Sequence, residues 1–155
     1  MTLADKFPKK LVADSVERQF RPGTVIKLEA TMDDGKSHLK RYVIVAVTES
    51  AFVLVINSEI SDYIKARPIL LQSQVPMPAA AHSFMDHDSH IDCSRARVFM
   101  RQAAIEQLQQ NPAWVLGTIT QDTGNAIVAS IKPARTISTK QKEQLCESLA
   151  RCDFA

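Results

Sequence analysis

Residues 24–57 read TVIKLEATMDDGKSHLKRYVIVAVTESAFVLVIN, and this stretch decides the fold. Over Thr24–Met32 apolar and polar residues alternate, which is the period of a half-buried β-strand. Asp33-Asp34-Gly35 follows, and a glycine there accepts the positive φ that a tight reversal requires. The pattern predicts a strand, a turn and a returning strand.

The returning part of this stretch contains two further apolar runs. Arg41–Val47 and Ala51–Ile56 are rich in β-branched residues and are separated only by Thr48-Glu49-Ser50. Runs of this length and composition are typical of strands, and so short a polar connection is typical of a hairpin. Together with the first strand they predict a three-stranded antiparallel meander.

Before the meander, the apolar residues follow a helical spacing. Val12, Val16 and Phe20 fall four residues apart, on one face of a helix that Pro8 can begin. Arg21-Pro22-Gly23 ends this helix, because neither proline nor glycine favours its continuation.

Helical spacing returns in the last third of the chain. Met100–Gln110 carries apolar residues at helical intervals, and an Asn-Pro pair follows it. Near the end, Ser138 stands three residues before Gln141, as in a capping box, and Leu145 and Leu149 then share one helical face. Two helices are therefore expected here.

The intervening segments are less regular. Asn57–Arg67 is expected to be a loop with a short helix capped by Asn57 or Ser58. His87–Val98 is expected to form one strand, and Trp114–Thr120 is either a strand or a buried helical segment.

The order of elements predicts the fold class. Strands dominate early and helices later, which favours a single α+β domain over residues 1–155. We expect an N-terminal helical segment over 1–22, a β-rich core over 23–98, and a mainly helical part over 99–155. The short strands are expected to curl into a small antiparallel SH3-like β-barrel, with the helices concentrated in the C-terminal half.

Composition excludes several classes of protein. Of 155 residues 45% are hydrophobic and 23% charged, as in globular domains, and the net charge is +2. The N-terminus has no apolar signal-peptide core, and no run reaches the roughly 18 apolar residues of a membrane helix. Three sparse cysteines favour reduced thiols. We therefore expect a cytoplasmic protein with no membrane partner.

The most distinctive segment reads HSFMDHDSHIDCS and spans His82–Ser94. It holds three of the four histidines, with aspartates and one cysteine, which are ligand types that zinc accepts. The spacing matches no helical or knuckle pattern, so we expect no metal or other cofactor. A solvated polar strand edge is one alternative, and general acid–base chemistry by His87 between Asp86 and Asp88 is the other.

Two basic sets accompany this segment. Lys40 and Arg41 open the second strand and can bind a phosphate at the rim of the sheet, although a charged strand end is the more usual case. Arg95 and Arg97 would share a strand face and can follow a nucleic-acid backbone. The sequence contains no P-loop and no dinucleotide-binding glycine motif.

The order of these features resembles the PemK/MazF growth-inhibitor family. The resemblance is carried by Arg21-Pro22-Gly23, the strand after it, the glycine turn, and the run KRYVIV that starts at Lys40. It extends loosely to Ile131 through Val115-Leu116-Gly117-Thr118-Ile119. Two departures are Tyr42, where the family has proline, and Asn57-Ser58-Glu59, which stands in place of its Pro-x-Thr/Ser signature.

The resemblance implies an SH3-like barrel that cleaves single-stranded RNA without a metal, forms a homodimer and binds an antitoxin protein. Arg41 would stabilise the phosphorane charge, and His87 or Asp88 would be the base or acid. The substrate contacts would come from Lys40, Ser58, His90, Arg95 and Arg97.

Two alternatives belong to other functional classes. One is a non-catalytic interaction module on the same barrel, binding a protein partner through Pro76–Ala81 or the N-terminal helix. The other is a metal-dependent enzyme built on His82, His87 and His90.

Overall fold

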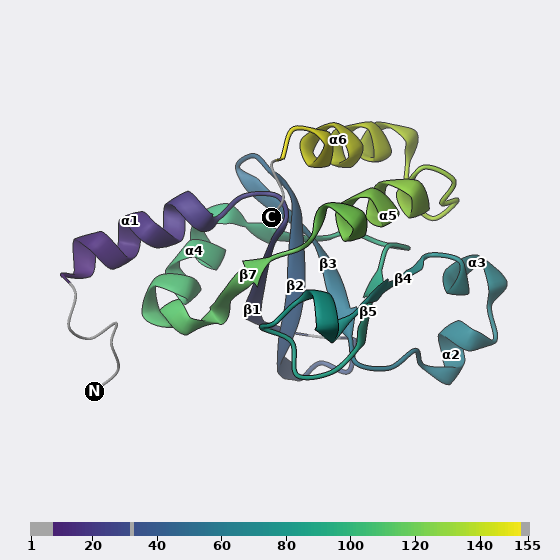
Figure 1. Cartoon of the computed structure of the whole chain (residues 1–155), viewed down its shortest axis with the longest axis horizontal. Helices are drawn as coiled ribbons and strands as arrows, with labels where there is room; N and C mark the ends of the chain where they lie inside the picture. Colours follow the sequence, from purple (N-terminus) through teal and green to yellow (C-terminus); the bar gives the residue numbers. More distant parts are fainter. Residues whose placement is uncertain (1–7, 32, 153–155) are drawn as a thin grey trace.

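A computed structural model describes residues 8–31 and 33–152 of the chain (Figure 1). The expected meander is confirmed: β1 (Thr24–Thr31), β2 (Ser37–Val47) and β3 (Ser50–Asn57) pair antiparallel in sequence order. Gly35 in the first turn has a φ of 76°, as the turn pattern requires. Met32, the last residue of the expected first strand, lies outside the described residues.

Four short strands complete the sheet: β4 (Gln74–Met77), β5 (Ser89–Asp92), β6 (Arg97–Met100) and β7 (Val115–Thr118). The strand order is β4-β5-β3-β2-β1-β7, and β6 also pairs with β3. One edge of β3 is therefore shared, with β6 against its first half and β5 against its last residues. The sheet is antiparallel and does not close into a barrel.

One expected element is wrong in detail. The segment His87–Val98 forms two strands, β5 and β6, and not one. The break follows from Asp92, whose Oδ1 atom accepts hydrogen bonds from the amide and hydroxyl of Ser94 at 3.0 and 2.6 Å. Such local bonds stabilise a turn in place of a continued strand.

The longer helices form two pairs on different sides of the sheet (Figure 1). One pair is α1 (Lys9–Gln19) and α4 (Arg101–Gln110), and the other is α5 (Gln121–Ile131) and α6 (Thr139–Ala150). Among the described residues, the short elements are α2 (Asp62–Lys65), α3 (Pro68–Leu71) and the 3₁₀ turns η2 (Ala79–Ala81) and η3 (Pro112–Trp114). The fold is thus α+β, with helices in both halves. Within the described residues, no helix is long and apolar enough to cross a membrane.

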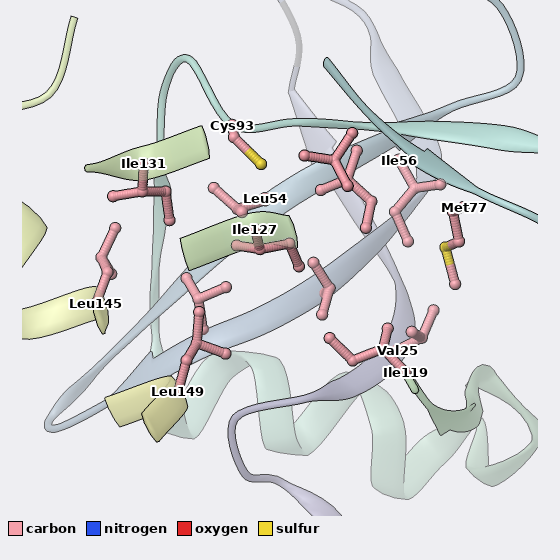
Figure 2. Close-up of a cluster of buried hydrophobic side chains, with 14 of the residues drawn as sticks. Val25, Leu54, Ile56, Met77, Cys93, Ile119, Ile127, Ile131, Leu145 and Leu149 are labelled. Atoms are coloured by element: carbon pink, nitrogen blue, oxygen red, sulfur yellow. The ribbon is translucent and has the colours of Figure 1, made fainter. Parts of the chain in front are cut away.

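Helix pairs on both sides are needed because β2 is apolar on both faces. Every residue of Tyr42–Ala46 is fully buried. Val43 belongs to a core under α5 and α6, where Ile127 and Leu145 meet the sheet (Figure 2). Tyr42 and Ile44 belong to a second core, which Val16 of α1 and Leu108 of α4 complete. Burial on both faces explains why the sequence over β2 is a continuous apolar run.

Hydrogen-bonding side chains begin three of the helices. The Ser138 hydroxyl accepts from the amide of Gln141 at 3.2 Å, so the predicted cap of α6 is confirmed. The expected cap by Asn57 or Ser58 is wrong, since Ser61 caps α2 by accepting from Ile64 at 3.3 Å. Thr120 caps α5 in the same way.

The approach of β7 to the core depends on a glycine. A Cβ atom added at Gly117 would lie 2.4 Å from Cδ1 of Phe84. We expect Gly117→Ala to lower the free energy of unfolding by about 1–3 kcal/mol, because the phenyl ring must leave its site. Urea denaturation of the two proteins measures this difference.

A double-mutant cycle identifies the cause. In a Phe84→Ala background the methyl group of Ala at position 117 has room, so the same change should cost far less. An equal cost in both backgrounds would show that the ring is not the obstacle.

Candidate functional site

Arg41 lies in the middle of β2, directly opposite Lys27 on β1 and Ile56 near the end of β3. Side chains that are directly opposed in antiparallel strands project from the same face. Two cations therefore stand side by side on the face that carries the α5–α6 core. Like charges in this position destabilise the strand pair, and an anion between them would remove that cost.

The guanidinium of Arg41 has little to satisfy it within the described residues. Its Nη2 atom lies 3.6 Å from Oδ2 of Asp86, which is too long for a good hydrogen bond. Its Nε atom is buried without a hydrogen-bond partner. The Arg41 side chain is 26% exposed and the Asp86 side chain 84% exposed, so this ion pair is weak. The guanidinium retains donors for an incoming anion.

Asp86 belongs to a loop, residues 82–88, that is fixed to the fold at its start by His82. This histidine is buried, and its Nδ1 atom lies 2.8 Å from the carbonyl of Pro78. Its Nε2 atom accepts from the amide of Thr120 at 3.3 Å. Because Nε2 accepts, Nδ1 is the ring nitrogen that donates to the Pro78 carbonyl. His82 therefore joins the loop to the start of α5 and is not available to a ligand.

Two more residues fix the rest of the loop. Met85 is buried in the core under α5 and α6. Asp88 accepts from the amide of Ala79 at 2.9 Å through its Oδ1 atom. Between these two anchors, Asp86 and His87 are exposed. The loop thus presents His87 beside the residue that pairs with Arg41.

Lys40, the chain neighbour of Arg41, projects from the other face of the sheet. Its Nζ atom donates to Oδ1 of Asn57 at 3.2 Å. His90 on β5 is directly opposite Asn57, so these three polar side chains share that face. Ser58, the first residue after β3, is exposed. The structure therefore separates Lys40 and His90 from Arg41.

Arg95 and Arg97 lie in a third place. They line a groove of about 400 Å³ between the end of β1 and β6, together with Ala30, Thr31, Ala96, Val98 and Phe99. Arg95 precedes β6 and is exposed, whereas Arg97 is its first residue. The described residues offer neither guanidinium an ion-pair partner.

The residues of His82–Cys93 do not converge. No three or more His, Cys, Asp or Glu side chains within residues 8–31 and 33–152 lie close enough to hold a metal ion together. Asp92 is engaged by Gln74 and Ser94. Cys93 points into the core, and burial, reinforced by Asp92, raises the pKa of its thiol (Figure 2). Such a thiol is a poor nucleophile.

Sequence reasoning missed two members of the site. Lys27 could have been found, because the register set by the glycine turn places it opposite Arg41. Asp86 as the partner of Arg41 could not, because that contact depends on the path of a loop. No protein-family model matches this chain, and no curated protein matches it significantly. The function is therefore inferred from this geometry.

The two loop histidines give a matched pair of variants. We expect His82→Ala to lower the free energy of unfolding by about 2–4 kcal/mol, because it leaves a cavity and two unpaired backbone groups. The exposed His87→Ala should change it by less than about 0.5 kcal/mol. Thermal or urea denaturation measures both, and equal losses would contradict this division of roles.

Proposed function

We propose that this chain is a metal-independent endoribonuclease that acts on single-stranded RNA. One observation carries the proposal: Arg41, with an unsatisfied buried Nε atom, stands opposite Lys27 and 3.6 Å from Asp86, whose chain neighbour His87 is exposed. Two adjacent cations suit a phosphodiester, and a titratable imidazole beside them suits proton transfer. The resemblance to the PemK/MazF growth inhibitors points to the same chemistry.

In the proposed reaction, His87 takes the proton of a ribose 2′-hydroxyl. The 2′-oxygen bonds to the adjacent phosphorus, and the bond from phosphorus to the 5′-oxygen breaks. The leaving oxygen takes a proton from water, and the hydroxide that remains takes the proton from His87, giving a 2′,3′-cyclic phosphate, a 5′-hydroxyl and the starting imidazole. Arg41 and Lys27 stabilise the charge that develops on the phosphorane.

In this scheme Asp88 is a positioning residue. Its bond to the amide of Ala79 holds the last turn of the loop, which keeps His87 in place. Asp86 takes the position nearest the guanidinium, where it aligns Arg41 until the phosphate displaces it. In this proposal the predicted substrate residues outside the groove, Lys40, Ser58 and His90, contact more distant nucleotides, whereas Arg95 and Arg97 take no part in RNA binding.

The same proposal includes a relationship of this fold to the SH3-like barrels. In this proposal the meander, with β5 and β6 along the outer edge of β3, derives from an SH3-like barrel that is open between β1 and β6. A homodimer, an antitoxin partner and a cytoplasmic location belong with it. The open edge of β6 favours a second candidate, a non-catalytic module that binds a protein partner.

Cleavage of a labelled single-stranded RNA in EDTA tests the activity. We expect Arg41→Ala to slow cleavage by about 100-fold, because it removes the cation nearest the phosphorus. His87→Ala should slow it by 100-fold or more, as expected for the loss of a general base. Lys140→Ala, which removes an exposed cation on α6, is the control and should cleave like the wild type.

Equal residual cleavage by the wild type and both site variants would show a contaminating nuclease and would exclude this proposal. Cleavage that Arg41→Ala abolishes but Lys27→Ala leaves unchanged would confine the cationic role to Arg41.

A further inference from the structure

The strand β6 has one open edge. Within the described residues it pairs only with β3, with Met100 opposite Ser50. The amide of Arg101 donates to the carbonyl of Glu49 at 3.1 Å, and these two residues continue the same register. In antiparallel strands, bonded and non-bonded positions alternate. The amide and carbonyl of Val98 and the amide of Met100 therefore point away from β3, toward the open edge, whereas the Met100 carbonyl lies at the N-cap of α4.

The opposite wall of the groove is the outer edge of β1. This edge pairs with β7 only as far as Ile26. At Glu29 the side chain of Gln107 takes over: its Oε1 accepts from the Glu29 amide at 2.9 Å, and its Nε2 donates to the carbonyl at 3.2 Å. The side-chain amide of Gln107 therefore occupies, at Glu29, the place that a neighbouring strand would take. The same edge continues to Thr31, which faces β6 across the groove.

The side chains at this groove are apolar and cationic. Val98 is 56% and Met100 73% exposed, which is high for residues of their kind. Arg95 and Arg97 line the groove, and its lining contains no carboxylate. The site therefore offers main-chain hydrogen bonds, apolar contacts and positive charge along one strand.

We propose that an extended acidic segment of a partner protein binds as an added strand along β6. Main-chain bonds to Val98 would supply affinity, and carboxylates opposite Arg95 and Arg97 would supply selectivity. A nucleic acid fits less well, because the groove lining has a single aromatic residue, Phe99, which is partly buried against the core and packs on Tyr42 at 5.4 Å between ring centroids. This inference does not depend on RNA cleavage.

The probe that tests the proposal is a fluorescein-labelled peptide of three Glu-Val repeats. Its binding to the full chain is measured by fluorescence anisotropy. Val98→Pro removes the outward amide without removing a bond to β3, and proline is tolerated on edge strands. We expect it to weaken binding about five- to tenfold. Val98→Thr keeps the amide and the side-chain shape, so it should bind like the wild type.

Hydrogen exchange gives a second readout that needs no variant. Saturating peptide should slow exchange at Val98 and Met100, whose amides are open in the free protein. The double variant with Arg95→Gln and Arg97→Gln should bind the peptide more weakly than the wild type. This loss should be larger at low salt than at high salt, because salt screens the charges. His87→Ala should bind the peptide normally, which separates this site from the proposed nuclease site.

Four results would overturn the proposal. They are no saturable binding below about 1 mM peptide, equal binding of Lys-Val repeats, unchanged exchange at Val98 and Met100, and displacement of the peptide by single-stranded RNA. The last result would assign the groove to nucleic acid.

Discussion

The structure depends on the burial of β2 on both of its faces. The five residues of Tyr42–Ala46 are inaccessible to solvent, so the sheet is stable only with helices packed on each side. The helix pairs α1–α4 and α5–α6 meet this requirement and enclose two separate cores. The first half of the strand, Ser37–Arg41, leaves this cover and carries Lys40 and Arg41. The cations are therefore held at a rigid part of the fold.

Strand alternation then divides the polar residues between two environments. Arg41 joins Lys27 and the loop with Asp86 and His87, whereas Lys40 projects from the opposite face with its bond to Asn57. The loop is rigid for a similar reason, since its buried residues belong to the core and to the start of α5. Asp86 and His87, between the anchors Met85 and Asp88, are exposed. Stability and chemistry thus use different residues of one short segment.

The sequence predicted the elements whose patterns are local. The meander and the helix cap at Ser138 follow from alternation, spacing and composition. The errors arose where side chains compete with the backbone. Asp92 bonds to Ser94 and ends β5, which alternation over His87–Val98 did not indicate. Arg41 was predictable as a site residue, but its contact with Asp86 was not, because no local pattern fixes how a loop crosses a sheet.

The central claim is that the Arg41 guanidinium binds a phosphate of RNA. Its buried Nε–H group gives the most direct test, because the ¹⁵N resonance of an arginine Nε reports on its own hydrogen bonding. We predict that a short 2′-O-methyl RNA, which cannot be cleaved, shifts the Arg41 Nε–H resonance in a saturable manner. Lys27→Ala should weaken this binding. An Arg41 resonance that stays unchanged while the RNA binds elsewhere would contradict the account.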